Sequence, residues 1–198
     1  MKRILFLVVP VLFMAACHSP LPDTKGGEKK AADTVKKDFI PVGDFLKSEI
    51  ASVDSYPQLI KCYHIRQGTT DSMILTTAQF DRLSKEFLRQ ELDSPAFEKE
   101  FEEASFLDRS TSLLNFTYAT KDTGYGLKRV DFLAMPGTGG VNKMSSIYME
   151  VRAGNKDTAE IRKMSWKAGS YFSILHIYQP TQGTATTSIT KVVWDSKD

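Results

Sequence analysis

Apolar residues recur every three to four positions in the first part of the chain and every second position in the rest. Within residues 41–56, Val42, Leu46, Ile50 and Val53 are four, four and three positions apart. This spacing places them on one side of a helix, so we expect a helix with a single apolar stripe here. The proline that follows ends it, because the residue before a proline avoids the helical region.

A short hairpin and a second helix are expected next. Residues 59–66 alternate between two faces, and residues 72–75 can return as a partner strand. Thr76 and Gln79 have the spacing of a capping box, in which each residue bonds the backbone of the other. We therefore expect a helix to begin directly after the hairpin.

A third helix is predicted to begin at Asp93-Ser94-Pro95, within the acidic run from Glu91 to Asp108. The aspartate and serine before its proline suit a helix start. Its buried side is expected to hold Phe97, Phe101 and Ala104. The seven carboxylates of the run against one lysine indicate either a solvated helix face or a surface for a basic partner.

Beyond Asp108 the period of the pattern changes to two residues. Apolar and polar positions alternate in six runs, at 114–118, 130–134, 147–151, 161–166, 171–178 and 189–194. The breaks between them contain glycines, which permit the positive φ that tight turns require. Strands at such short spacing predict an antiparallel meander with one packed and one wet face.

These elements predict an α+β domain over residues 39–198. We expect a single antiparallel, curved meander of five or six strands with three helices packed on one face. The short N-terminal hairpin is expected as a separate addition. The helical stripes need an apolar surface to pack against, and the meander supplies it.

The start of the chain has the pattern of an export signal. Lys2 and Arg3 precede an apolar run of about a dozen residues, which is shorter than the ~20 residues that span a bilayer. The run ends in Met14-Ala15-Ala16-Cys17, which resembles the lipobox of bacterial lipoproteins. The resemblance implies that residues 1–16 are a signal peptide, removed before a Cys17 that carries fatty acyl groups such as palmitate. The alternative is an ordinary secretory signal cut at the two alanines.

Residues 17–38 are expected to form a lipidated, disordered tether. They contain two prolines, a glycine pair and charges of both signs, with few large apolar residues. By resemblance to lipoproteins generally, an aspartate directly after the cysteine would retain the protein in the inner membrane. This chain has His18 at that position. We therefore expect the periplasmic face of the outer membrane, with the acyl groups as the membrane contact.

Charge and cysteine content argue against a nucleic-acid partner and against a disulfide within the chain. Without Lys2 and Arg3, 24 of the 26 basic residues remain, against 24 acidic residues. This balance gives no basic footprint for nucleic acid, so no nucleic-acid partner is expected. With Cys17 acylated, Cys62 remains alone and no disulfide can form within the chain.

Catalytic chemistry has few candidates. Cys62 and His64 are two residues apart on one strand and share a face, so a thiol–imidazole pair is possible there. A hydrolase using His64 or His176 is the enzymatic alternative, although no G-x-S-x-G elbow occurs. No metal-binding spacing is present, and no metal or cofactor is expected.

Aromatic residues on the meander offer a different site. If the sheet encloses a concavity, an apolar ligand could contact side chains at five positions, namely Phe132, Trp166, Phe172, His176 and Trp194. In the alternative interpretation these aromatic rings pack against the helices.

The whole chain resembles small lipoproteins of Bacteroidota to which no activity is assigned. The lipobox carries most of this resemblance, followed by the phrases at 44–47 and 105–108 and the strand at 114–118. The resulting expectation is an anchored, non-enzymatic domain that binds an envelope protein or an apolar molecule. A lipid carrier shaped as a half-barrel is one alternative, and the oligomeric state stays open.

Overall fold

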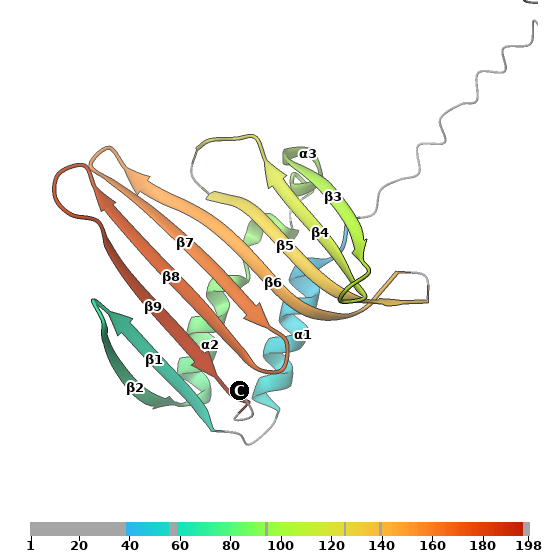
Figure 1. Cartoon of the computed structure of the whole chain (residues 1–198), viewed down its shortest axis with the longest axis horizontal. Coiled ribbons are helices and arrows are strands. Elements are labelled where there is room, and N and C mark those ends of the chain that lie inside the picture. Colours follow the sequence, from blue (N-terminus) through green and yellow to red (C-terminus); the bar gives the residue numbers. More distant parts are fainter. Residues whose placement is uncertain (1–38, 56–58, 94, 125, 139, 196–198) are drawn as a thin grey trace, which may run out of the picture. The chain divides into compact units, whose positions relative to one another are not determined.

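A computed structural model describes residues 39–198, apart from positions 56–58, 94, 125, 139 and 196–198. The expected signal peptide (1–16) and tether (17–38) therefore lie outside the described residues. Within these residues, nine strands form one antiparallel sheet in the order β2-β1-β9-β8-β7-β6-β5-β4-β3 (Figure 1). From β3 to β9 each strand pairs with the next strand of the chain, and β1 pairs with the last strand, β9.

The strands are β1 (Ile60–Arg66), β2 (Thr69–Leu75), β3 (Phe101–Asp108), β4 (Leu113–Thr120), β5 (Gly126–Gly137), β6 (Gly140–Asn155), β7 (Thr158–Lys167), β8 (Tyr171–Pro180) and β9 (Thr186–Val193). The helices are α1 (Val42–Asp54), α2 (Thr77–Ser84) and α3 (Phe97–Glu100), with single 3₁₀ turns η1 (Lys85–Phe87) and η2 (Gln90–Asp93).

The expectation of an α+β fold with five or six strands and a separate hairpin is wrong. The six expected runs are present as β4 to β9, but three more strands belong to the same sheet, and the helices are short. β1 pairs with β9 over six residue pairs, among them Cys62 opposite Val192. Both side chains are buried, so the hairpin extends the apolar surface of the meander. It also covers an edge that β9 would otherwise leave open to pairing.

β3 replaces most of the expected third helix. α3 covers only Phe97–Glu100, and the chain is extended from Phe101 onward, paired with β4. A longer helix would bring Glu98 and Glu102 one turn apart, where like charges repel. In the strand Phe101 is buried, whereas Ala104, expected on the buried side of a helix, is exposed. As an edge strand β3 keeps its carboxylates in water, and such charges discourage pairing with other chains.

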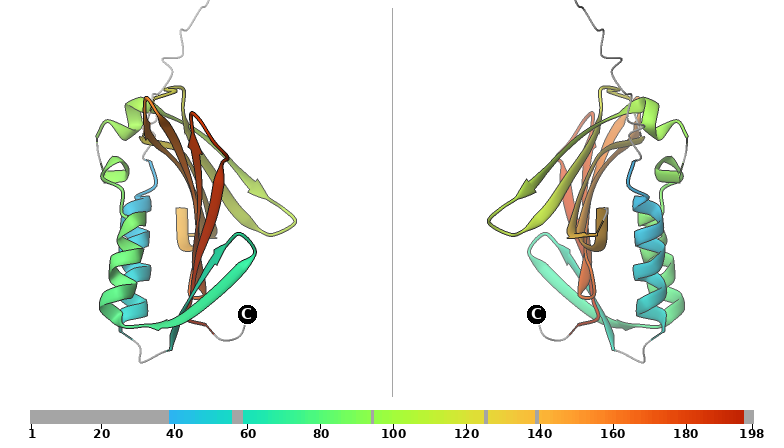
Figure 2. Two further views of the ribbon diagram at one scale, coloured as in Figure 1. Left: turned by 90° about the vertical axis from the view of Figure 1, so that its left-hand side faces the viewer. Right: turned by 90° about the vertical axis from the view of Figure 1, so that its right-hand side faces the viewer.

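The helices lie on one face of the sheet, as the two side views in Figure 2 show. The helix expected over residues 41–56 is confirmed as α1, and its stripe residues Val42, Leu46 and Val53 are buried. The capping box at the start of α2 is confirmed as well. There the Thr76 amide donates to Gln79 Oε1 at 2.9 Å, and the Gln79 amide donates to Thr76 Oγ1 at 3.3 Å.

A row of opposed residues crosses the helix-covered face from β1 to β4. In strand order it consists of Cys62, Val192, Phe172, Trp166, Ile147, Phe132 and Phe116. All of these except Phe116 are buried. Phe80 of α2 and Phe87 of η1 pack over the row, with their ring centroids 6.3 and 5.2 Å from that of Trp166. Successive residues of a strand point to opposite sides, so the neighbours of these residues form the helix-free surface, which we call the outer face.

Removing the phenyl ring of Phe80 should destabilise the whole domain. Phe80 is fully buried against Trp166, Phe172 and Trp194. We expect Phe80→Ala to lower the free energy of unfolding by about 3–5 kcal/mol, through lost transfer energy and a residual cavity. Urea unfolding followed by tryptophan fluorescence measures this change. As a control, Tyr178→Ala removes a ring that is 45% exposed and should cost less than about 1 kcal/mol.

Candidate functional site

The four aromatic residues expected to face a ligand lie in the core. Phe132, Trp166 and Phe172 are fully buried and Trp194 is 6% exposed. Rings of the helix layer occupy the space over them, including Phe80 over Trp194 at a centroid distance of 5.6 Å. The helices therefore fill the concavity of the sheet at these positions, and a ligand reaches the four rings only if the helices move away.

Cys62 and His64 lie side by side on the helix-covered face of β1. Cys62 Sγ is 3.5 Å from His64 Nε2, and His64 Nδ1 is 3.2 Å from Thr190 Oγ1 on β9. Burial raises the pKa of the Cys62 thiol, so the thiol stays protonated at neutral pH and donates to Nε2. The other ring nitrogen, Nδ1, is then the one at hydrogen-bond distance from the Thr190 hydroxyl. This arrangement holds a buried thiol in place and leaves it a poor nucleophile.

His176 belongs to a separate polar cluster. Its Nε2 lies 2.8 Å from Glu160 Oε1, and Glu160 also contacts Arg162 Nε at 3.5 Å. Arg162 extends the cluster to the helix layer, where its Nη1 lies 3.4 Å from Glu86 Oε2. An open groove of about 390 Å³ adjoins His176, where the β1–β2 hairpin ends before β8 and β9 do. His64 and His176 thus have different partners and do not form one site.

No group of three His, Cys, Asp or Glu side chains that could hold a metal ion occurs within the part of the chain that the structure describes. Among the same residues, no helix has both the length and the apolar character needed to cross a membrane.

The outer face carries an apolar patch that the helices do not cover. Ile65, Ile189 and Leu175 are opposed in one row across β1, β9 and β8. Ile161 and Ile177 form a second opposed pair directly beside Leu175. All five side chains are half-buried by their neighbours in the sheet. A contiguous apolar cluster on an exposed surface is typical of an interaction site.

A hollow of about 320 Å³ lies on the same face beside the patch. Its walls and floor include Leu133, Tyr148, Ser165 and Tyr171. Ser165 and Ser173 bond each other through their hydroxyls at 2.8 Å, so small residues occupy the middle of the sheet here. Burial, together with the nearby carboxylates of Glu150 and Asp131, raises the pKa of Tyr148. Its hydroxyl is therefore protonated and able to donate a hydrogen bond to a partner.

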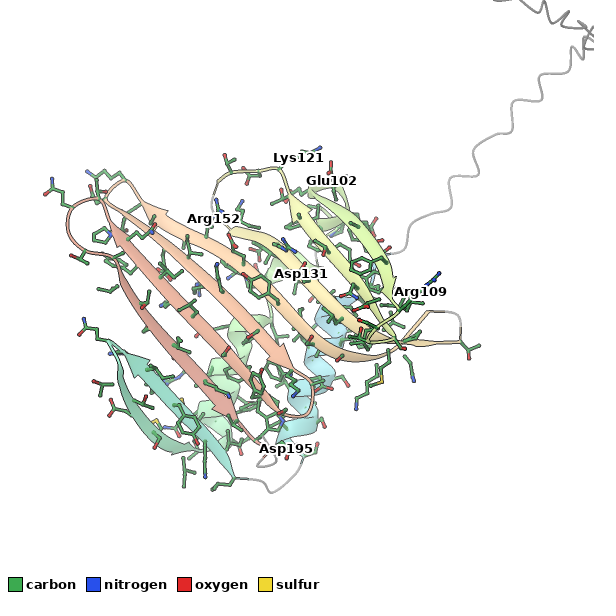
Figure 3. All side chains as sticks on the ribbon, viewed as in Figure 1. Glu102, Arg109, Lys121, Asp131, Arg152 and Asp195 are labelled. Carbon is green, nitrogen blue, oxygen red and sulfur yellow. The ribbon has the colours of Figure 1, made fainter. Side chains whose placement is uncertain are left out.

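Lysines surround the patch and the hollow. The outer positions of β1, β7 and β9 carry Lys61, Lys163, Lys167 and Lys191. Lys191 Nζ lies 4.5 Å from the centroid of the Tyr171 ring, and Lys167 Nζ lies 5.8 Å from the same centroid. The outer face therefore combines aliphatic, aromatic and cationic groups on neighbouring strands. Figure 3 views this face from the front.

Sequence reasoning missed this surface, although the sequence contains the signal for it. Lys61 precedes Cys62, Lys191 precedes Val192, and Lys163 precedes Met164. Once the second residue of each pair is assigned to the core, strand alternation requires the lysine to face the other way. Recognising that these lysines gather in one place also required the order of the strands.

The thiol of Cys62 should resist alkylation in the folded protein. In a Cys17→Ser chain Cys62 is the only cysteine. Because it is fully buried and its pKa is raised, we expect iodoacetamide to label it only upon unfolding in urea. Met73→Cys in a Cys62→Ala background, at a position that is 50% exposed, should label promptly. Rapid labelling of Cys62 under native conditions would contradict the buried, protonated state.

Comparison with known proteins adds no relative to this geometry. No family model, no curated protein and no solved structure matches the chain.

Proposed function

We propose that the protein is a lipid-anchored lipoprotein of the periplasm whose domain binds a protein partner at the cell envelope without catalysis. The observation that carries the binding function is the outer face, where an apolar patch and a hollow adjoin lysines. Proteins use such surfaces, with a buried apolar centre and a polar rim, to hold other proteins. The proposal therefore places binding on the surface of the sheet.

Binding of a protein is favoured over binding of an apolar ligand inside the domain. A lipid carrier shaped as a half-barrel needs an interior concavity lined by apolar side chains. Here the side chains that could line such a concavity, such as Trp166 and Phe172, are fully buried under aromatic rings of the helix layer. The hollow on the outer face is about 320 Å³ and open, which suits one large side chain of a partner better than an acyl chain.

The anchor rests on the sequence alone. Acyl groups on Cys17 would hold the domain at a membrane through a tether of about 20 residues. A flexible chain of that length spans ~25 Å on average, at ~5–6 Å times √n. The domain would then reach partners near the membrane surface without crossing the periplasm. His18 after the cysteine favours the outer membrane.

A hydrolase is the less favoured candidate. A nucleophile needs an activating base and access to substrate. The Cys62 thiol has a neighbouring imidazole at 3.5 Å but is fully buried. The imidazole of His176 is accessible, but its Nε2 is bonded to Glu160. His64 contacts the buried Cys62 thiol and the Thr190 hydroxyl, and His176 contacts the Glu160 carboxylate, so neither imidazole is paired with an exposed thiol or serine in these contacts.

The anchor predicts incorporation of fatty acid at a single residue. In the native host, radiolabelled palmitate should enter the wild-type protein and should not enter Cys17→Ala. The wild-type protein should fractionate with the outer membrane, and the variant should keep an uncleaved signal, because lipoprotein processing requires the modified cysteine. A mature wild-type protein free of label would contradict the lipoprotein assignment.

The binding function predicts which substitutions abolish the activity of the chain in cells. In a strain lacking the gene, Leu175→Asp together with Ile189→Asp should fail to restore the wild-type phenotype. Both residues are half-buried on the outer face, and charges there disrupt an apolar contact while leaving the helix-side core intact. The melting temperature of the purified variant checks that it is folded.

A double histidine variant, compared in the same complementation assay, tests the enzymatic alternative. His64→Ala together with His176→Ala should restore the phenotype fully, because neither imidazole lies on the outer face. Loss of complementation in a well-folded double histidine variant would favour the hydrolase instead.

A further inference from the structure

The charges on the outer face are distributed unevenly between its two halves. On β2, β1, β9, β8 and β7, the positions that point outward include four lysines and no aspartate or glutamate. On β5 and β6 two pairs of outward charges neutralise each other. Arg129 bonds Asp131 at 2.8 Å, and Arg152 bonds Glu150 at 3.1 Å. Figure 3 labels Asp131 and Arg152 on this second half.

Three of the four lysines in the lysine-bearing half, Lys61, Lys163 and Lys191, make no ion pair among the described residues. Lys191 is opposite the uncharged Tyr63 and Ser173. Lys163 is opposite Leu175 on β8 and Glu150 on β6, and the Glu150 carboxylate already bonds Arg152 at 3.1 Å. A surface of one sign attracts a partner of the opposite sign and rejects partners of its own sign.

The apolar groups lie between these lysines. The patch of Ile65, Ile189, Leu175, Ile161 and Ile177 is bordered by Lys163 and Lys191, and the hollow is bordered by Lys167 and Tyr171. A complementary partner therefore needs apolar side chains in its middle and carboxylates along its margins. An amphipathic helix has this pattern, with an apolar stripe flanked by charged residues.

The shape of the face distinguishes such a segment from a lipid bilayer, which also combines apolar and anionic groups. The β1–β2 and β3–β4 hairpins lean away from the helices, so their tips stand out on the side of the outer face (Figure 2). A flat bilayer would meet these tips first and would be held away from the strands between them. A narrow protein segment can lie between the tips and reach the hollow.

We propose that the outer face binds an acidic amphipathic segment of its partner protein, with carboxylates against Lys61, Lys163 and Lys191 and a large apolar side chain in the hollow. This inference rests on the proposed binding function and specifies the chemistry of the partner.

The test uses a photo-crosslinking amino acid in the full-length anchored protein. Benzoylphenylalanine is placed at Ser165, which lines the hollow, and as a control at Arg82, which is exposed on the helix layer. Irradiation of intact cells should yield a crosslinked protein from position 165 and not from position 82. Mass spectrometry of the crosslinked peptide should place it in a segment with an apolar stripe and an excess of Asp and Glu.

Charge reversal tests the role of the lysines. K61E/K163E/K191E should lower the crosslink yield by at least about tenfold, since three attractive exposed pairs become repulsive. K85E/K99E/K156E makes the same change of charge at exposed lysines elsewhere and should leave the yield unchanged. Equal melting temperatures exclude unfolding as the cause.

Each other outcome overturns the inference in a recognisable way. If Ile189→Ser abolishes the crosslink while the lysine reversal does not, or if the captured segment is neutral or basic, the partner is not acidic and the binding function stands. Crosslinking to phospholipid identifies the bilayer as the occupant. Crosslinks that are absent at position 165 and present at position 82 refute both the inference and the proposed use of the outer face.

Discussion

Burial on one side of a single sheet is the constraint on which the rest of the structure depends. The strands place their large apolar residues on the helix-covered face, and only that face receives a second layer. The contact is largely aromatic, with Phe80 and Phe87 over Trp166 and Phe172. Aromatic pairs bury much area with few rotatable bonds, so three short helices are enough to close the core.

This one-sided packing leaves the other face free to vary. In a strand, a substitution on the outer face changes the surface without changing the residues that hold the helices. The outer face tolerates lysines because their charged ends stay in water while their methylene groups cover neighbouring side chains. The same freedom would tolerate carboxylates at these positions. Their absence from the outward positions of β1, β7, β8 and β9 is therefore a property of this surface that the fold does not impose.

Local patterns in the sequence predicted the structural features that depend on residues close together in the chain. The stripe of Val42, Leu46 and Val53 gave α1, and the alternating runs gave β4 to β9. The shared face of Cys62 and His64 followed from their separation of two residues, and the two atoms involved lie 3.5 Å apart. These features need no knowledge of distant parts of the chain.

The features that the sequence left undetermined depend on contacts between distant residues. The pairing of Lys61 with Val193 joins two ends of the domain, and no local pattern specifies it. Phe101 fits a helix by spacing, but its burial beside Phe97, whose ring packs on Tyr118, requires a strand that begins there. The aromatic residues of the meander fit both a ligand cavity and a packed core. What decides between these is the position of α2 and η1, which is again a long-range property.

Net charge, like the local patterns, leaves undetermined a property that depends on contacts between distant residues, in this case the choice of binding partner. A chain with 24 acidic residues and, after loss of its signal, 24 basic residues has no overall preference for an anionic or cationic partner. Binding, however, responds to the charges within about a Debye length of the contact, ~8 Å at physiological ionic strength. At that range the lysine-bearing half of the outer face is positive, whereas on β5 and β6 the Arg129–Asp131 and Arg152–Glu150 pairs are balanced. A balanced composition is therefore compatible with a strongly selective surface, and the selectivity arises when strand pairing brings Lys61, Lys163 and Lys191 onto one face.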